Sequence, residues 1–328
     1  MLKSLSRIGA LAALCATFGL MSATAQAQAQ TYPTRQIQMI LGFPPGPVDI
    51  VGRPVAAKLQ EALGQTVVFE NRPGANGAIA TEQVTRAAPD GYTILLATSG
   101  THVTAVHLTK NLRYNPVKDF EPIIAAVEPV TCLVVHPSVP ANTVQELVAW
   151  INANPGKVSY GTSGNGSVFH LTGELFKQTA GVQMAHVPYR GLDPAMSDLI
   201  AGHIPVLFTA MSTAAPQVDG GKAKLIAMLE PERFARRPNT PSITEAIPAF
   251  RKPPTWFGFF APKGTPEPII AKLNAEIAKI LATPDMQARF QDAGYAMLGG
   301  PPQRLHDMMV DGIDRFGTII KSVGIEPE

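Results

Sequence analysis

Residues 37–64 read IQMILGFPPGPVDIVGRPVAAKLQEALG, and this stretch decides the fold class. Its first part, residues 37–43, is a short apolar run that predicts a buried strand. Its second part places four apolar residues at helical spacing: Val51, Val55, Leu59 and Leu63. Gly64 follows where such a helix would end. A buried strand, a short loop and an amphipathic helix together indicate an α/β protein.

The same alternation of short strands and amphipathic helices continues along the chain. Further helices are predicted at residues 78–87, 143–152, 167–179 and 192–201. Further strands are predicted at residues 66–69, 92–97, 158–160, 184–186, 205–208 and 225–228. This pattern is typical of a largely parallel sheet that is covered by helices on both faces.

The C-terminal part has an aromatic strand at residues 256–260 and then a long helix. The apolar face of that helix consists of Ile269, Ile270, Leu273, Ile277 and Ile280. Because this part has no strand-rich core of its own, we expect it to pack back onto the N-terminal half. The chain would then cross between two domains near residues 126–131 and 254–257, as a hinge requires. The expected domains are residues 30–128 plus 256–328, and residues 129–255.

The first 29 residues have the features of a cleavable export signal. Lys3 and Arg7 precede an apolar run at residues 8–21, and overlapping A-x-A sites follow at residues 23–29. The alternative, a membrane anchor, needs about 20 apolar residues, which this run does not reach. Lipid attachment at Cys15 is disfavoured because a leucine precedes it. We therefore expect a periplasmic protein released by cleavage between residues 25 and 30.

Charge and cysteine content restrict the partners. Without Lys3 and Arg7, the 27 basic residues fall to 25, which equals the number of acidic residues. No run of Lys and Arg occurs, which argues against nucleic acid and anionic lipid. Cys132 is the one cysteine after the signal, so no intramolecular disulfide is expected, and its apolar surroundings predict a buried thiol.

The loop after the first strand is the first candidate for ligand binding, since ligands of open α/β sheets bind beyond the carboxyl ends of strands. Its candidate contacts are Phe43, Pro45, Gly46 and Asp49. Prolines stiffen the loop, Gly46 permits close approach, and Asp49 could cap the following helix. The alternative is a rigid turn without a ligand.

The second candidate is the loop at residues 160–167, YGTSGNGS, between a predicted strand and a predicted helix. Its candidate contacts are Thr162, Ser163, Gly166 and Ser167. Hydroxyls and free N–H groups at the positive end of a helix form a natural anion site, although a flexible linker has the same composition.

Three further residues are candidates at other strand ends. Arg190 could pair with an anion and Tyr189 offers a ring and a hydroxyl, but a surface turn with a solvated arginine fits as well. Ser99 follows the predicted strand at residues 92–97 and either faces the ligand or caps a helix. His170 is expected to be a structural hydrogen-bonding residue.

Enzyme motifs are not supported. Residues 164–169 imitate G-x-G-x-x-G without the third glycine, and Arg190 stands where an acidic ribose-binding residue is expected. No hydroxyl loop matches G-x-S-x-G, and the histidines show no metal-binding spacing. We therefore expect no catalytic residues, no metal and no cofactor.

A set of motifs recurs in order along the chain and resembles a known family. They are Tyr32–Pro33, residues 42–49, residues 70–77, residues 88–93, Lys118–Asp119–Phe120, His186–Val187–Pro188–Tyr189, Trp256–Phe257–Gly258, Ala261–Pro262 and Gly264–Thr265–Pro266. The chain resembles the Bug-type periplasmic solute-binding proteins of tripartite tricarboxylate transporters.

The resemblance implies a two-domain Venus-flytrap fold, the fold of periplasmic binding proteins, whose cleft closes on a small carboxylate. It implies that residues 43–49 and 162–167 hold the carboxylate and that Tyr189 and Arg190 line the second wall. One departure is visible: the family's first loop usually has two adjacent glycines and often a hydroxyl residue before the aspartate. Here one glycine, Gly46, is present and Val48 precedes Asp49, which implies one fewer donor.

The expected function is capture of a small organic carboxylate, an aliphatic or aromatic mono- or dicarboxylate, and its delivery to the membrane subunits of such a transporter. The expected protein is a monomer. The alternative is a receptor that senses a ligand for a membrane signalling protein. A distant alternative is an NADP-dependent oxidoreductase.

Overall fold

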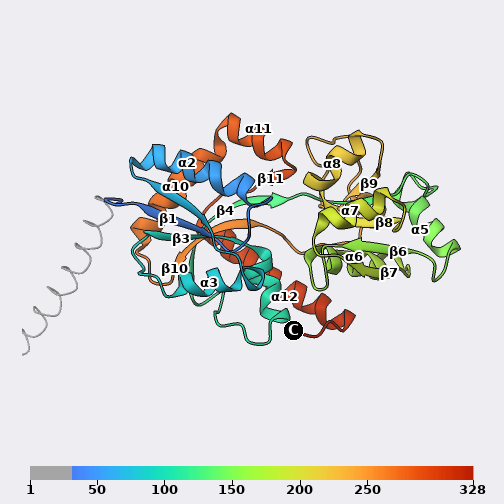
Figure 1. Ribbon diagram of the computed structural model, residues 1–328, viewed down its shortest axis with the longest axis horizontal. Helices are drawn as coiled ribbons and strands as arrows, with labels where there is room; N and C mark the ends of the chain where they lie inside the picture. The colour runs from blue at the N-terminus through green and yellow to red at the C-terminus, as the bar shows by residue number, and fades with distance from the viewer. Residues whose placement is uncertain (1–31, 328) are drawn as a thin grey trace, which may run out of the picture.

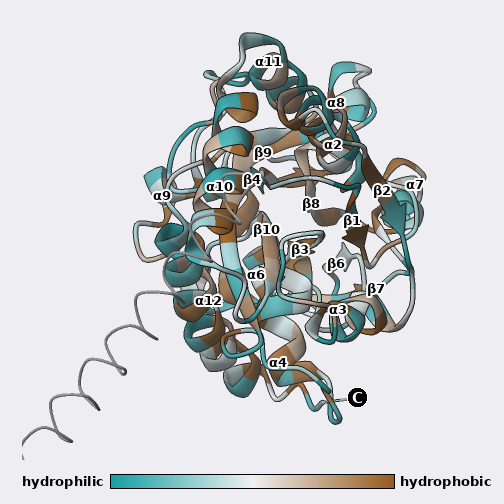
Figure 2. Cartoon of the chain, turned by 90° about the vertical axis from the view of Figure 1, so that its left-hand side faces the viewer, coloured by the Kyte–Doolittle hydropathy of each residue, from teal (hydrophilic) through white to brown (hydrophobic). Residues whose placement is uncertain are grey.

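The computed structural model describes residues 32–327, so the predicted signal peptide and Cys15 lie outside the described residues. Two β-sheets lie side by side along the long axis of the molecule, and each is covered by helices (Figure 1). Figure 2 shows hydrophobic colour on interior strands such as β1 and β8, whereas outer helices such as α12 carry hydrophilic and hydrophobic colour in turn. Within residues 32–327, no helix is long and apolar enough to cross a membrane.

The first sheet has six strands in the order β11-β4-β10-β3-β1-β2. Their bounds are β1 (Ile37–Leu41), β2 (Val67–Asn71), β3 (Thr93–Thr98), β4 (Phe120–Pro129), β10 (Phe257–Pro262) and β11 (Tyr295–Met297). The helical elements around it are α2 (Asp49–Leu63), η1 (Ala75–Gly77), α3 (Ala78–Thr85), η2 (Gly100–Thr104), α4 (Ala105–Leu108), α10 (Glu267–Ala282), α11 (Pro284–Asp292) and α12 (Pro302–Val323).

The second sheet has five strands in the order β7-β6-β8-β5-β9. Their bounds are β5 (Thr131–Val135), β6 (Ser159–Thr162), β7 (Ala185–Pro188), β8 (Val206–Ala210) and β9 (Lys224–Met228). Its helices are α5 (Val144–Ala153), α6 (Val168–Ala180), α7 (Leu192–Ile200), α8 (Met211–Asp219) and α9 (Ile243–Ala246).

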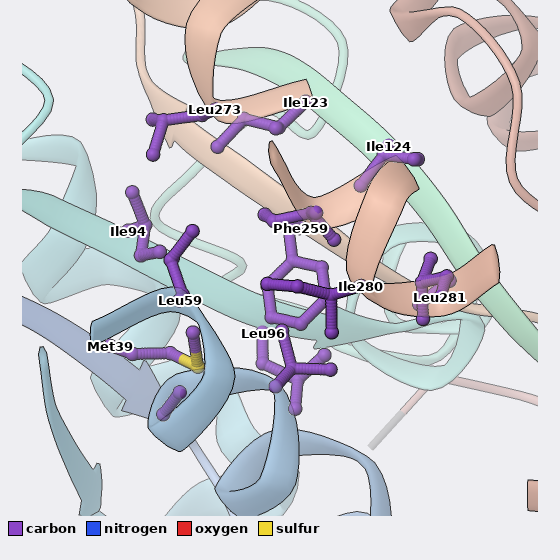
Figure 3. Packing of buried hydrophobic residues seen from close by; sticks show 14 of the residues in the cluster. Met39, Leu59, Ile94, Leu96, Ile123, Ile124, Phe259, Leu273, Ile280 and Leu281 are labelled. Atoms are coloured by element: carbon purple, nitrogen blue, oxygen red, sulfur yellow. The ribbon is translucent and has the colours of Figure 1, made fainter. Parts of the chain in front are cut away.

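Both faces of the first sheet are buried, as the continuous apolar strands predict. Along β1, Met39 packs on the face covered by α2 and α10, while Ile40 packs on the face covered by α3 and α12. Figure 3 shows the first of these faces, where Leu59 of α2 and Ile280 of α10 surround Phe259 of β10. Each such large side chain contributes about 1.5–3 kcal/mol through removal from water.

The second sheet has the same two-sided packing. Leu133 faces a cluster that includes helices α5 and α6, while the neighbouring Cys132 faces the cluster of α7 and α8. Cys132 is fully buried, so its predicted burial is confirmed. Burial raises the pKa of the Cys132 thiol far above its usual range, with a further increase from the carboxylate of Glu230.

The prediction of a largely parallel sheet is wrong, because both sheets are mixed. In the first sheet β10 runs antiparallel to β3 and β4. In the second sheet β5 runs antiparallel to β8 and β9. The physical reason is the chain path: β4 leaves the first sheet, β5 enters the second, and β10 returns, so these strands are not joined by βαβ crossovers.

The expected return of the C-terminal part to the N-terminal half is confirmed, since β10 lies between β3 and β4. The chain passes from the first sheet to the second between Pro129 and Thr131 and returns before Phe257. A further contact joins the halves: Leu171 of α6 is fully buried in the cluster that contains Phe316 of α12.

Candidate functional site

A cavity of about 630 Å³ is lined by residues from the connecting loops of both sheets. This volume is typical of sites that bind small molecules. The parallel strands β1, β2 and β3 and the parallel strands β6, β7 and β8 all end on it, because the segments that follow each of them contribute lining residues. Much of the lining therefore comes from the segments at the carboxyl ends of six strands, where ligands of α/β sheets bind.

Five of the predicted site residues line this cavity, and they come from both halves of the chain. They are Phe43, Ser99, Ser163, Gly166 and Ser167. Ser99 begins the turn into η2 and its side chain makes no capping bond there, so the capping alternative is wrong. Ser167 does cap α6, because its Oγ accepts from the N–H of His170 at 3.2 Å.

The other six predicted residues lie outside the lining: Pro45, Gly46, Asp49, Thr162, Tyr189 and Arg190. Arg190 is exposed in the turn between β7 and α7. The hydroxyl of Tyr189 donates to Asp198 Oδ2 at 2.7 Å and so holds the following helix. Thr162 is fully buried, and its Oγ1 lies 2.6 Å from His186 Nε2.

Asp49 fixes the first loop and does not cap α2, which corrects the expected cap. It lies in the first turn of the helix, after the N-cap residue Val48. Its Oδ2 accepts from the N–H of Gly46 at 3.0 Å and from Asn71 Nδ2 at 3.1 Å, and its Oδ1 accepts from Arg53 Nε at 2.8 Å. Charge-assisted bonds of this kind are about twice as strong as neutral ones. Asp49 therefore positions the loop that carries Phe43.

A close backbone contact brings the second loop of this half to the cavity. A Cβ on Gly42 would lie 2.7 Å from Gly77 Cα, so position 42 must lack a side chain here. This approach places η1 beside the first loop, and Ala75 and Asn76 then line the cavity.

The glycine loop of residues 163–167 is held from behind by two stacked imidazoles. The rings of His170 and His186 lie 3.7 Å apart with an interplanar angle of 8°. The N–H of Gly166 donates to His170 Nδ1 at 3.1 Å, and the N–H of Gly164 donates to Thr162 Oγ1 at 3.2 Å. The loop amides at 164 and 166 are thus occupied inside the protein.

Burial favours the neutral form of both imidazoles. Burial lowers the pKa of His170, with an opposing increase from Glu174 and a smaller decrease from Lys177. Burial, together with the neighbouring His170, lowers the pKa of His186 to about 4. A neutral His170 can accept from Gly166, which a protonated imidazole cannot do.

Two helix N-termini lie at the cavity. The first turn of a helix has N–H groups without intrahelical partners, and Val168 and Phe169 of α6 lie on the lining. Ser212 and Thr213 in the first turn of α8 lie on it as well. This second terminus was not predicted from the sequence, although α8 follows directly after a predicted strand.

The remaining lining is largely apolar and aromatic. Leu108, Phe169 and Leu192 contribute to it, and Phe257 packs against Tyr295 with ring centroids 5.6 Å apart. Among the described lining residues there is no Lys, Arg or His, and Glu326 is the one charged residue. An anion here would be held by amide dipoles and hydroxyls, not by a cationic side chain. No group of His, Cys, Asp and Glu within residues 32–327 could hold a metal ion.

Residues 51–325 match the family described as the tripartite tricarboxylate transporter family receptor, TctC. This chain belongs to the TctC family. The membership confirms the predicted resemblance and identifies a solute-binding receptor, not an enzyme, which excludes the oxidoreductase alternative.

Solved structures of similar proteins support the same assignment. The periplasmic binding protein BugD is 34% identical, with a TM-score of 0.75, over 90% of this chain and 100% of BugD. R. palustris Rpa4515 with adipate is 32% identical, with a TM-score of 0.80, over 90% of this chain and 100% of that protein. MatC from Rhodopseudomonas palustris with bound malate is 32% identical, with a TM-score of 0.74, over 88% and 100%. The two-domain α/β fold of periplasmic binding proteins is thereby confirmed for this TctC-family chain.

Proposed function

We propose that this TctC-family protein captures a small organic carboxylate in the cavity between its domains and delivers it to the membrane subunits of a tripartite tricarboxylate-type transporter. The observation that carries the proposal is the convergence of the first turns of α6 and α8 on one cavity. N–H groups at helix N-termini bind anions, and a carboxylate offers two acceptor oxygens. Relatives of this chain have been solved with adipate and with malate.

The ligand site proposed here comprises both domains. Ser163, Ser167 and the α6 terminus hold the carboxylate on one side, while Phe43 and Ser99 cover it from the other. We keep Pro45, Gly46, Asp49, Thr162, Tyr189 and Arg190 as residues that shape or surround this site. The division into residues 30–128 plus 256–328 and residues 129–255 makes closure around the ligand a hinge motion, which would bury the ligand.

The protein would act in the periplasm as a monomer after removal of residues 1–29. The second candidate function, sensing for a membrane signalling protein, needs the same cavity. The two differ in the partner: a transporter deletion abolishes uptake of the ligand in the first case and leaves it unchanged in the second.

A thermal-shift screen of aliphatic and aromatic carboxylates, with adipate and malate included, tests the proposal. A true ligand at a hundredfold excess over Kd stabilises the native state by about 2.7 kcal/mol. Hits are confirmed by calorimetry on wild type and on Ser163→Ala, which should bind more weakly. Ser197→Ala, an exposed serine on α7, is the matched control and should bind as wild type does. The absence of any carboxylate hit, or equal affinity in the Ser163 variant, contradicts the proposed site.

A further inference from the structure

A buried ion cluster lies where the two domains join. Lys252 Nζ is 3.2 Å from Glu128 Oε1, 2.9 Å from Glu230 Oε2 and 3.0 Å from Thr255 Oγ1. The side chain of Lys252 is only 1% exposed. Lys252 donates hydrogen bonds to Glu128 and Thr255 and forms an ion pair with Glu230, and it lies outside the cavity lining, so it does not meet a ligand directly.

The cluster belongs to both domains. Glu128 lies near the end of β4, on the outgoing crossing, and Glu230 follows β9 of the second sheet. Lys252 lies on the returning segment, three residues before Thr255. The cluster thus ties the two crossings to the second sheet.

Two threonines separate the cluster from the cavity, and both line it. Thr131 Oγ1 donates to Glu230 Oε1 at 2.7 Å, and its N–H donates to the same oxygen at 2.8 Å. Thr255 Oγ1 donates to Glu128 Oε1 at 3.3 Å. Because both hydroxyl hydrogens point to carboxylates, the two threonines can offer the cavity only acceptor lone pairs.

The charge of the cluster also favours a hydrogen-bond donor of the ligand at this end of the cavity. With every group ionised, two carboxylates face one ammonium, which leaves one negative charge behind the threonines. The cavity therefore has donors at the α6 and α8 termini and acceptors with negative charge at the hinge. A ligand must match this polarity, because an unpaired charge inside a protein is costly.

We infer that Thr131 and Thr255, with the Glu128–Lys252–Glu230 cluster behind them, form a specificity-determining wall that accepts an uncharged hydrogen-bond donor of the ligand and disfavours a second carboxylate. The inference rests on the proposed function and narrows it: one carboxylate at the helix termini, and a hydroxyl or another neutral donor toward the hinge. A dicarboxylate that reaches this wall enters together with a proton, which is taken up by Glu128.

Of the two carboxylates, Glu128 has the longer polar contacts, 3.2–3.4 Å against 2.7–2.9 Å for Glu230, so its ionised form is held less firmly and it is the group that takes up this proton. Burial and the neighbouring Glu230 raise the pKa of Glu128 to about 7, against the opposing effects of Lys252 and the Thr255 N–H. Lys252 stays charged, because the two carboxylates outweigh the decrease that burial causes and raise its pKa. From β11, the residue opposite Glu128 is the apolar Ala296. A second ligand carboxylate would raise the pKa of Glu128 further.

Calorimetry with two series of matched probes tests the inference. The four-carbon series is butyrate, 4-hydroxybutyrate and succinate. The six-carbon series is hexanoate, 6-hydroxyhexanoate and adipate. At pH 8 the hydroxy acid should bind at least tenfold more tightly than the dicarboxylate of the same length. At pH 6 this ratio should fall below about threefold. In buffers of different ionisation enthalpy, dicarboxylate binding at pH 8 should take up close to one proton, and hydroxy acid binding close to none.

Glu128→Gln keeps the size of the side chain and an acceptor for Thr255, and it removes the negative charge. It should reduce the pH 8 ratio to below about threefold and abolish the proton uptake. Glu121→Gln is the matched control, because Glu121 lies on the same strand in an ion pair with Lys263, outside the cavity lining, and it should behave as wild type does.

A wild-type protein that binds either dicarboxylate at pH 8 as tightly as its hydroxy acid overturns the inference, and this measurement needs no variant. A ratio that is unchanged by pH or by Glu128→Gln also overturns it. Both results leave the proposed function intact, since a carboxylate has bound. Failure of all six probes to bind would count against the proposed function itself, and against the wall with it.

Discussion

The backbone N–H of Gly166 donates a hydrogen bond of 3.1 Å to Nδ1 of His170, one turn further along the chain. The bond fixes the glycine loop at a position where φ is +66°, in the left-handed region. His170 itself is held by its stacking on His186. The shape of the loop beside the proposed carboxylate site therefore depends on a side chain that does not line the cavity.

His170→Phe should weaken ligand binding while it preserves the fold. Phenylalanine keeps a ring against His186 and removes the acceptor of the Gly166 N–H. A neutral hydrogen bond contributes about 0.5–1.5 kcal/mol, so the Kd should rise roughly two- to tenfold. Calorimetry with a carboxylate from the screen measures it. His306→Phe, a substitution on the outer surface of α12, is the control. An unchanged Kd in folded His170→Phe protein would show that the loop does not need this bond.

Gly166→Ala should hinder the contact between the domains. A Cβ at this position would lie 2.5 Å from Leu108 Cδ1, which belongs to α4 of the other domain. The left-handed backbone also costs an alanine about 1–2 kcal/mol, which lowers the free energy of unfolding. Affinity should fall severalfold, because the added methyl group opposes the arrangement in which Leu108 covers the loop.

The double variant Gly166→Ala/Leu108→Ala separates the two effects, with Leu108→Ala alone as its reference. The space left by Leu108 should restore the affinity, whereas the loss in unfolding free energy should remain. Such coupling is what a double-mutant cycle measures. Affinity losses that simply add would mean that Leu108 and position 166 do not meet in the ligand-bound protein.

Many of the strands and helices could be predicted because each of these segments has its own hydrophobic period, although β4, α8, α11 and α12 were not predicted. Val51, Val55 and Leu59 are buried on α2, as their spacing predicts. The antiparallel direction of β10 could not be predicted, since it depends on where the chain returns from the second domain, and no local pattern encodes that. β11 could not be predicted for another reason, because its three residues are too few to show a hydrophobic period.

Part of the candidate site was predictable from one rule, which is that ligands of open α/β sheets bind beyond the carboxyl ends of parallel strands. Ser99 and Ser163 follow parallel strands and line the cavity, and Ser212 follows β8 in the same way, so the rule could have identified it. Thr131 and Thr255 could not be predicted from this rule, because they lie on the crossings between domains. Arg190 was a candidate through its charge, and charge carries no information on which way a side chain points.

The exported protein should begin between Gln26 and Gln30 and carry no lipid. The prediction rests on the A-x-A series at residues 23–29 and on the leucine before Cys15. Intact-mass spectrometry of protein from the periplasmic fraction gives the first residue directly. An acylated N-terminus at Cys15 would contradict the prediction and convert the protein into a membrane-anchored receptor.

Cys132 should react with a thiol reagent slowly in the native protein and rapidly after unfolding. It is fully buried, and burial raises the pKa of its thiol, so the reactive thiolate is scarce. Protein that lacks residues 1–29 should be used, because it contains no second cysteine. Similar rates with and without guanidinium chloride would mean that the second sheet opens readily around β5.

Glu128 should make the protein less stable as the pH rises toward 8. The pKa of Glu128 is raised in the folded state from 4.5 to about 7, first by burial and then by Glu230. The folded chain therefore binds a proton that the unfolded chain has released between these two pH values. The resulting stabilisation is complete below pH 4.5 and is lost as the pH rises through 7, and the full shift corresponds to about 3 kcal/mol at most.

Urea unfolding of wild type and Glu128→Gln at pH 5, 6.5 and 8 measures this contribution. Groups remote from Glu128 cancel in the difference, so the glutamine variant should gain on wild type between pH 5 and pH 8. Glu121→Gln should show no such trend, because its carboxylate lies in a part-exposed ion pair with Lys263. A difference that is flat with pH would mean that Glu128 stays ionised beside Lys252 throughout this range. The hinge would then hold a fixed negative charge, and a dicarboxylate would bind without proton uptake by Glu128.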